Sequence, residues 1–178
     1  MNDISFEIKK HIKTYKDWPH EGSVFRDLTD IYQHPEITQK CVNRLAERYL
    51  NANLTHIAIL EARAFVLGSM LAARLNLPII LIRKPHKIAG EIIQSHDGPN
   101  TRPLQMLRDS CTVNDNVLIF DDLIAKGDST IGAIDLVKQT GANIFEAACL
   151  VCLPDLKGVQ NIGALNIPVF NLCAFEGV

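Results

Sequence analysis

The chain has 178 residues, of which 47% are apolar, 21% charged and 6% aromatic, and its formal net charge is -2. That length is typical of one domain with a sizeable core, and the near-neutral charge excludes the general basic excess of a nucleic-acid-binding protein. No apolar run approaches the ~20 residues of a membrane helix, and the charged N-terminus lacks the apolar segment of a secretory signal.

Two helices are expected in the first fifty residues. The first is predicted over 3–16, because apolar side chains recur three or four residues apart, at Ile4, Ile8, Ile12 and Tyr15. Pro and Gly then break the pattern, and we expect residues 24–32 to be irregular or extended. The second helix is predicted over 35–50, with Pro35 in its first turn.

The rest of the chain alternates between strands and helices. Short apolar segments predict five strands, over 56–60, 79–84, 116–122, 143–153 and 168–173. Helices are predicted between them over 64–76 and 129–141, whereas 85–110 has little periodicity and is expected to leave the sheet. This alternation predicts an α/β fold with a mostly parallel sheet flanked by helices.

Ligands of such sheets bind beyond the carboxyl ends of the strands. The apolar runs IILI (79–82) and VLIF (117–120) are typical of buried parallel strands. We therefore expect the functional residues directly after the strands. The five cysteines, an odd number spread along the chain, indicate reduced thiols in a cytosolic protein rather than a disulfide framework. Cys149 and Cys152 fall within a predicted buried strand, which favours a core role over a metal or redox role.

The strongest chemical signal follows the third strand. Asp121 and Asp122 precede a short loop with a glycine and hydroxyl side chains, which opens a helix. Exposed amides at a helix start bind phosphate, and carboxylates accept hydrogen bonds from sugar hydroxyls. The alternative is an ordinary helix entry, with Asp128 or Ser129 as the capping residue.

Five segments resemble those of one enzyme family in the same order. FDDLIAKGDST (120–130) resembles the 5-phosphoribosyl diphosphate (PRPP) motif of type I phosphoribosyltransferases. Further segments are similar to those of the adenine phosphoribosyltransferase family: VFRDLTDIY (24–32), ILEARAF (59–65), LIRKPHK (81–87) and DLKG (155–158). The similarity covers about residues 17–175.

The resemblance implies a fold and a reaction. It implies a type I phosphoribosyltransferase-like domain over 1–178, with an N-terminal helix and base-binding hood segment over 1–34. An α/β core follows over 35–178, with a mobile loop at about 85–110. The implied reaction converts adenine and PRPP to AMP and diphosphate in the cytoplasm, with Mg²⁺ as cofactor. A homodimer is also implied, in which residues 83–87 of one subunit reach the other's site.

The resemblance also implies three groups of binding residues. Those for PRPP and its ribose phosphate are Asp121, Asp122, Ala125, Lys126, Gly127, Asp128 and Ser129. Those for the diphosphate are Ala62, Arg63, Arg83, Lys84 and Lys87, whose cations suit the charge of a leaving diphosphate. Those for the base are Val24, Phe25 and Arg26. No catalytic acid or base and no direct metal ligand is assigned.

The chain departs from the family pattern in two loops. Asp128 stands where the family has a glycine, and adds negative charge to the phosphate loop, which Lys126 can offset. In the mobile loop the family's Glu-Tyr-Gly is absent, and only His96 and Asp97 could take its place. These changes favour an alternative function, a weak or inactive homologue that binds PRPP or a purine nucleotide as a sensor.

The histidines form no metal-binding sequence motif. His11, His20 and His34 lie in polar segments, and we expect them at the surface.

Overall fold

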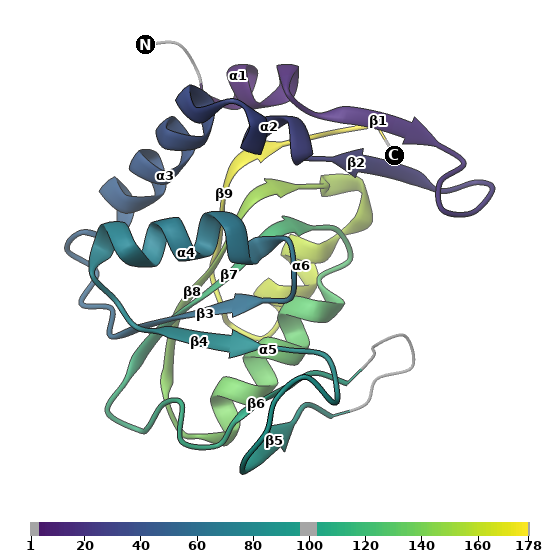
Figure 1. The fold of residues 1–178 in the computed structure, drawn as a ribbon. Coiled ribbons are helices and arrows are strands. Elements are labelled where there is room, and N and C mark those ends of the chain that lie inside the picture. Colours follow the sequence, from purple (N-terminus) through teal and green to yellow (C-terminus); the bar gives the residue numbers. More distant parts are fainter. Residues whose placement is uncertain (1–3, 97–102, 178) are drawn as a thin grey trace.

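The computed structural model describes residues 4–96 and 103–177, whose arrangement is shown in Figure 1. In chain order its elements are α1 (Ile4–Lys10), β1 (Lys13–Lys16), β2 (Val24–Asp27), α2 (Thr29–Gln33), α3 (Pro35–Tyr49), β3 (His56–Leu60), α4 (Ala64–Leu75), β4 (Ile79–Ile82), β5 (Ile92–Gln94), β6 (Gln105–Leu107), β7 (Asn116–Ile124), α5 (Asp128–Gln139), β8 (Asn143–Cys152), a 3₁₀ turn (Pro154–Leu156), α6 (Gly158–Gly163) and β9 (Val169–Ala174).

The central sheet has five strands in the order β4-β3-β7-β8-β9, and every neighbouring pair is parallel. This confirms the predicted α/β class and the five strands. Helices α3, α4 and α5 lie within two residues of their predicted bounds, with proline in the first turn of α3. No helix of the described residues is long and apolar enough to cross a bilayer.

Both faces of the sheet are covered, and β7 shows how. Its buried side chains alternate: Leu118 and Phe120 pack in the cluster with α3 and α4, whereas Val117 and Ile119 pack in the cluster with α5 and α6. A strand with two buried faces needs a continuous apolar run, which explains VLIF. The strand then continues through the two acids to Ile124, two residues beyond its predicted end.

The expectation of burial was wrong for the other apolar run. Strand β4 is the edge of the sheet, and only alternate residues of IILI are buried. Ile79 and Leu81 are 39% and 46% exposed. An apolar run therefore indicated a strand correctly, but did not show that both faces were covered.

The first predicted helix is also too long. It ends at Lys10, and β1 pairs antiparallel with β2, with Tyr15 opposite Phe25. Ile8 and Ile12 are buried as the helical spacing requires, but Tyr15 is 48% exposed. Residues 24–27 are extended as expected, whereas the following residues form α2 rather than an irregular stretch.

The segment 85–110 leaves the central sheet as expected, but is partly regular. Strands β5 and β6 pair antiparallel in a small separate sheet, with Ile93 opposite Met106. Each strand has only three residues, too few to give a readable periodicity. The mobility expected for this loop stays a prediction, and its middle part, 97–102, lies outside the described residues.

Cys149 and Cys152 are buried thiols that form no disulfide. Burial raises the pKa of both thiols. The expected core role is therefore confirmed.

Candidate functional site

Two adjoining cavities open at the carboxyl ends of β3 and β7. The first, of about 270 Å³, is lined mainly by the loop between β7 and α5. The second, of about 190 Å³, lies between β7 and the residues that follow β3 and β4. Asp121, Leu123 and Ser129 line both cavities. The two cavities therefore lie next to each other and share part of their lining.

The structure brings most of the candidate residues to these cavities. The first cavity is lined by Asp121, Ala125, Lys126, Gly127, Asp128 and Ser129. The second is lined by Ala62, Arg63, Lys84, Asp121, Asp122 and Ser129. The candidates that line neither cavity are Arg83, Lys87, Val24, Phe25 and Arg26.

The loop of the first cavity is fixed by the start of α6. Gly127 has a φ of +88°, a left-handed conformation that glycine adopts without strain. A Cβ at this position would lie 3.0 Å from the carbonyl oxygen of Gly158. The Gly158 N–H donates to Ala125 O at 3.0 Å, and Asn161 Nδ2 donates to Lys126 O at 3.0 Å. Backbone contacts thus determine the shape of the loop.

Helix α5 begins at this loop with free amide groups. No side chain caps it, and the Ile131 N–H donates to Gly127 O at 2.8 Å as its first backbone bond. The N–H groups of the three preceding residues therefore have no acceptor within the helix. Such a helix start binds anions. The half-buried Asp128 lines the same cavity, so its carboxylate and a bound anion would share the space.

Asp122 is buried and Asp121 half-buried at the end of β7, and the ionisation of both acids is perturbed. Burial raises the pKa of Asp121 well above its usual range, and the neighbouring Asp122 carboxylate raises it further. Burial also raises the pKa of Asp122, against the opposing charge of Arg63. Arg63 Nε lies 2.8 Å from Asp122 Oδ2, and Arg63 Nη2 donates a hydrogen bond to Asp122 Oδ1 at 3.4 Å. The Asp122 N–H donates to Asp121 Oδ1 at 2.8 Å, which orients the first carboxyl group.

Glu61 organises the cationic side of the second cavity. Arg83 Nε and the Lys84 N–H donate to the same oxygen, Glu61 Oε2, at 2.6 and 3.1 Å. Burial of Glu61 would raise its pKa, but these hydrogen bonds keep it below the usual range. The positive charge of the Arg83 guanidinium is therefore balanced by the Glu61 carboxylate. The exposed Lys84 side chain lines the cavity. Lys87 is exposed beyond it.

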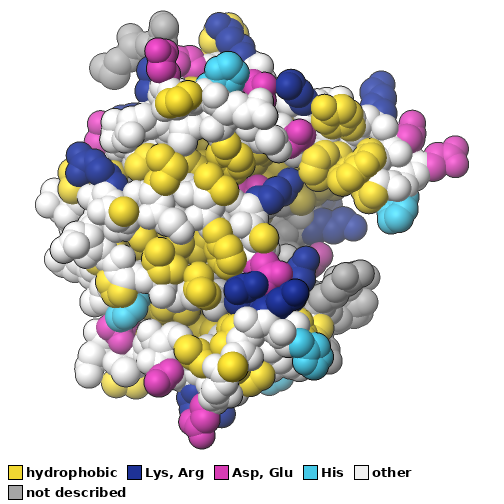
Figure 2. All heavy atoms as spheres, viewed as in Figure 1, with side chains coloured by type: hydrophobic (Ala, Val, Ile, Leu, Met, Phe, Trp, Pro, Cys, Tyr) yellow, Lys and Arg dark blue, Asp and Glu magenta, His cyan; other side chains and the backbone are white. Residues whose placement is uncertain are grey.

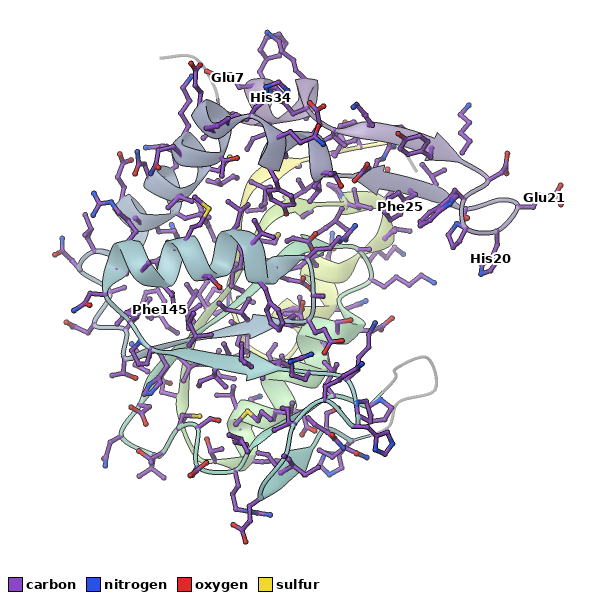
Figure 3. The ribbon with its side chains drawn as sticks, in the orientation of Figure 1. Glu7, His20, Glu21, Phe25, His34 and Phe145 are labelled. Atoms are coloured by element: carbon purple, nitrogen blue, oxygen red, sulfur yellow. The ribbon has the colours of Figure 1, made fainter. Side chains whose placement is uncertain are left out.

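The β1–β2 hairpin extends from the body of the molecule, with His20 near its tip (Figure 3). Phe25 lies on this hairpin, and its ring centre is 4.4 Å from that of Trp18. The Arg63 guanidinium lies 5.6 Å from the centre of the Phe25 ring. Arg63 thus contacts both the acid pair and the aromatic face of the hairpin, and connects the second cavity to Phe25.

The Arg26 side chain is directed elsewhere. Its guanidinium donates to Thr14 Oγ1 and Gly177 O and lies 4.4 Å from the centre of the Phe175 ring. The side chain is therefore engaged by β1 and the C-terminal residues. Any contact of Arg26 with a ligand beside Phe25 would come from its backbone, because successive strand residues face opposite sides. Val24 is half-buried at the start of the same strand.

His96 forms hydrogen bonds outside both cavities. Its backbone N–H donates to Asp135 Oδ2 at 2.7 Å, and its Nδ1 lies 2.8 Å from the same oxygen. Its side chain is 84% exposed. Asp97, the other residue considered for loop closure, lies outside the described residues.

Sequence reasoning missed two residues that shape the site. Glu61 lies within ILEARAF and Gly158 within DLKG, but the sequence predicted no role for either residue. A Cβ on Gly158 would lie 2.3 Å from Ala125 O, so only glycine fits there. Both residues act through neighbours that are distant in the sequence, and the only local signal was their position: Glu61 directly follows β3, and Gly158 opens the short helix α6 after β8.

Comparison with known proteins identifies the family. Residues 27–168 match the phosphoribosyl transferase domain. The chain is 41% identical over 179 residues to the adenine phosphoribosyltransferase of Pseudomonas fluorescens, covering 98% of this chain and 97% of the relative. It is 39% identical over 174 residues to that of a Marinomonas species, covering 97% of each.

Solved structures agree with this. The adenine phosphoribosyltransferase of Rhodothermus marinus has a TM-score of 0.89 at 29% identity, and covers 97% of this chain and 98% of its own. A second structure is the adenine phosphoribosyltransferase of Trypanosoma brucei in complex with AMP, pyrophosphate and ribose-5-phosphate. Its TM-score is 0.89 at 31% identity, and the match covers 96% of this chain and 79% of the Trypanosoma chain. The chain therefore belongs to the phosphoribosyltransferases of type I, and among them to the adenine phosphoribosyltransferase family.

Proposed function

We propose that the protein transfers the 5-phosphoribosyl group of PRPP to adenine, giving AMP and diphosphate. The observation that carries this proposal is the pair of adjoining cavities with Asp121 in their common wall. PRPP has a phosphate at one end, a diphosphate at the other and a diol between them. An anion site, an acid pair and a cationic site follow in the same order along the cavities.

The first cavity suits the 5'-phosphate. Its uncapped helix start offers N–H donors, and the loop from Ala125 to Ser129 surrounds the space before them. Asp121 and Asp122 would accept hydrogen bonds from the ribose hydroxyls, which requires their ionised forms. Their raised pKa values make this acceptor function weaker as the pH falls.

The second cavity suits the diphosphate. In the transfer, the bond from C1' to the diphosphate oxygen breaks, its electron pair leaves with the diphosphate, and N9 of adenine bonds to C1' and loses its proton. Arg63 and Lys84 would stabilise the charge that develops on the leaving group. Ala62 lies between them without a bulky side chain, and Lys87 provides a further cation close in sequence.

The donor set of the second cavity also fits Mg²⁺ that binds together with PRPP. Asp121 and Glu61 place carboxylate oxygens there, the ligand type that Mg²⁺ prefers. Bound Mg²⁺ supplies neutralisation of charge on the diphosphate. We assign no residue as its direct ligand, since Glu61 is bonded to Arg83 and Asp122 is paired with Arg63.

The hairpin suits the base. Phe25 offers an aromatic face next to Arg63, and any nucleobase can stack on such a face. Val24 and the backbone of Arg26 flank it on β2. The base would then lie beside the second cavity, on the side from which it can reach C1'.

The direct test is turnover. Purified protein with adenine, PRPP and Mg²⁺ should release AMP and diphosphate in equal amounts, and omission of adenine should stop AMP formation. The Asp121→Asn variant should lose most of this activity, because an amide is a weaker acceptor than a carboxylate. Absence of AMP with unconsumed PRPP would refute the proposal.

Asp128 favours a second candidate function, a sensor that binds PRPP or a purine nucleotide without turnover. Its carboxylate lines the phosphate cavity, where like charge weakens anion binding. Calorimetry separates the two functions, since a sensor binds AMP or PRPP but forms no product. Asp128→Gly should tighten binding of both ligands if the carboxylate obstructs the phosphate. Unchanged or weaker binding would mean that the site accommodates Asp128.

We also propose that the protein is a homodimer formed through an apolar patch on α4 and β4. The patch consists of Val66, Met70, Ile79 and Leu81, each between 36% and 46% exposed, and Figure 2 shows hydrophobic side chains gathered in this region. Strand β4 leads directly into residues 83–87, so this interface would bring them near the partner's site. Sedimentation should give a dimer that Leu81→Glu dissociates and Val113→Glu, at a distant exposed position, does not.

The cytoplasm is the compartment we propose for the protein. The five cysteines form no disulfide, which is typical of a reducing compartment.

A further inference from the structure

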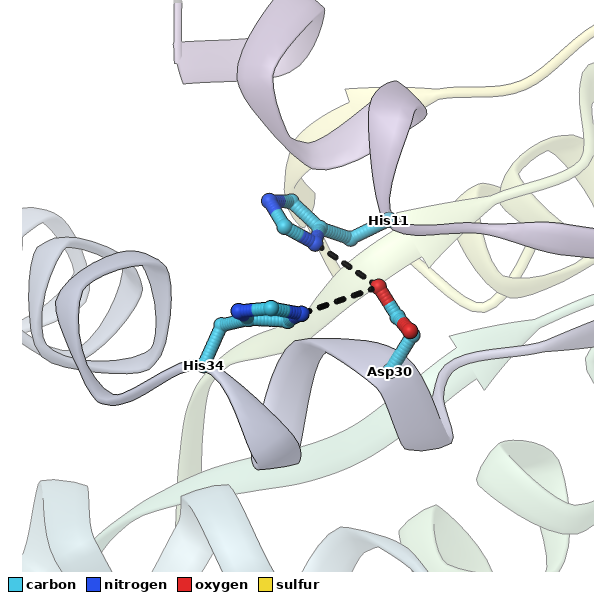
Figure 4. A group of neighbouring side chains, drawn as sticks. All are labelled: His11, Asp30 and His34. Atoms are coloured by element: carbon cyan, nitrogen blue, oxygen red, sulfur yellow. Dashed lines mark hydrogen bonds and ion pairs between the residues drawn. The ribbon is translucent and has the colours of Figure 1, made fainter.

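Three side chains meet outside both cavities, on the side of the hairpin that faces α1 and α3. His11 Nδ1 lies 2.8 Å from Asp30 Oδ2, and His34 Nε2 lies 3.6 Å from the same oxygen (Figure 4). All three ligand-type atoms lie within 4.8 Å of one another. Among the described residues this is the one group of at least three such side chains that could hold a metal ion. It corrects the expectation that His11 is simply a surface residue, because its side chain is only 26% exposed.

The spacing of these atoms is close to that of a zinc site. Zn²⁺ bonds to imidazole nitrogen and carboxylate oxygen are about 2.0–2.2 Å long, so tetrahedral ligand atoms lie roughly 3.4 Å apart. The two measured separations, 2.8 and 3.6 Å, lie on either side of that value. The third pair, the two imidazole nitrogens, lies within 4.8 Å.

The local fold brings these residues together. Asp30 lies in the first turn of α2 and His34 directly follows that helix, four residues later, so both side chains lie on one face. His11 projects from the turn between α1 and β1. The three ligands thus come from both ends of the segment that contains the hairpin, and a bound ion would link α1 to the start of α3.

One carboxylate oxygen of Asp30, Oδ2, is available to bind a cation. Lys13 Nζ lies 3.0 Å from Asp30 Oδ1, which leaves Oδ2 facing the two imidazoles. The two imidazoles complete a mixed nitrogen and oxygen set, which suits Zn²⁺ and similar transition metals rather than Mg²⁺.

A cavity of about 330 Å³ adjoins the cluster and gives solvent access to it. His11 and His34 line this cavity together with Glu7, Glu36 and Lys40. Glu7 is paired with Lys40 at 2.7 Å, so it is not a free competitor for the ion. The cavity can hold the water that a three-ligand zinc site takes as its fourth ligand.

We propose that His11, Asp30 and His34 bind one Zn²⁺ ion, which fastens the base-binding hairpin to helices α1 and α3. The ion is separate from the Mg²⁺ that accompanies PRPP, and takes no part in the transfer. Its effect is on stability and on the rigidity of the segment that carries Phe25.

Metal binding tests the proposal directly. The full-length protein, stripped with a chelator and kept in excess Mg²⁺, should bind one Zn²⁺ per chain near neutral pH. Saturation at 100-fold excess over Kd should raise Tm by about 5–10 °C. Co²⁺ should give the visible absorption of a four-coordinate nitrogen and oxygen site, without thiolate charge-transfer bands.

Variants of the cluster identify the ligands. His34→Ala should weaken Zn²⁺ binding by at least about tenfold, the lower end of what loss of even a supporting partner costs, and should abolish the Tm shift. The His34 side chain is 54% exposed, so this variant should fold. His20→Ala, at the exposed hairpin tip, is the matched control and should bind as wild type. Equal Zn²⁺ affinity in the His34 variant and the wild type, or a thiolate spectrum with Co²⁺, would overturn the proposal.

Discussion

The two halves of the proposed active site are built in different ways. The sugar-phosphate half stands on the end of β7, where Asp122 is 3% exposed and backbone contacts from Gly158 hold the loop. The base half is a hairpin of two four-residue strands, and β1 is exposed along its whole length. Side-chain contacts hold the hairpin to the body, among them Arg63 against Phe25 and Arg26 bonded to Gly177 O. Substitutions in the two halves should therefore affect PRPP and adenine separately.

Arg63 belongs to both halves, so its loss should break this separation. Arg63→Ala removes a cation from the diphosphate cavity, and loss of one such group typically costs about 10²–10³-fold in kcat. KM should also rise for both substrates, because the residue contacts Asp122 and Phe25. Steady-state kinetics with each substrate varied would measure these effects.

Arg44→Ala is the matched control, since Arg44 is 61% exposed on α3 and pairs only with Glu47 among the described residues. An Arg63 variant whose KM changes for one substrate alone would show that the two halves are independent at this residue as well.

Phe25→Ala should affect the base half alone. Loss of a stacking partner costs about 1–3 kcal/mol per base, which corresponds to a rise of about 5–150-fold in the KM for adenine. The KM for PRPP should stay near that of the wild type. Phe6→Ala on α1, where the ring is 62% exposed, is the control. A matching rise in the PRPP KM would contradict a separate base site.

Gly158→Ala should affect the phosphate half alone. The added methyl group would lie 2.3 Å from Ala125 O, so the loop must shift, at a cost of about 1–3 kcal/mol for such overpacking. PRPP and AMP binding should weaken together, as measured by calorimetry, and Tm should fall. Gly163→Ala in the same helix meets no atom within 4 Å and should behave as wild type. Equal behaviour of the two variants would mean that α6 does not support the loop.

Asp121→Asn should separate stability from function within the phosphate half. The folded protein raises the pKa of Asp121, so the fold loses stability as the pH rises from the ordinary aspartate pKa to that raised value, and the loss is complete above it. The variant should unfold at a higher Tm at neutral pH, by about 2–4 °C for each kcal/mol recovered. This gain should vanish as the pH falls below about 4, the ordinary aspartate pKa, because the carboxyl group is then protonated in both folded and unfolded chains.

The asparagine keeps the oxygen that accepts the Asp122 N–H, so the local backbone contact survives. The exposed Asp109→Asn provides the control. A Tm difference that does not depend on pH would exclude ionisation of Asp121 as its cause.

The difference between the two halves also explains what the sequence could reveal. Strands with buried faces have long apolar runs, and β3 was predicted with its observed bounds because four of its five residues are buried. The β1 segment KTYK has no buried residue, so its pairing with β2 left no hydrophobic pattern. The helical spacing of Ile4 and Ile8 therefore extended the predicted helix through it.

In the candidate site, too, only features that leave a local pattern in the sequence were predictable. Residues of local motifs, such as the acid pair and the loop after it, were predictable because strand, acids and helix start are adjacent in sequence. The pairing of Glu61 with Arg83, the support of the loop by Gly158 and the meeting of His11 with Asp30 depend on folding of distant segments. No local pattern encodes such contacts.

The wall common to the two cavities has a consequence for inhibitors. Because the two cavities share only Asp121, Leu123 and Ser129 of their lining, ribose 5-phosphate and inorganic diphosphate should occupy the protein at the same time, each in its own cavity. Two weak fragments joined by a linker of the right length gain from effective concentration. A bisubstrate-like compound that spans the wall should therefore bind far more tightly than either fragment, although it makes no contact that they lack.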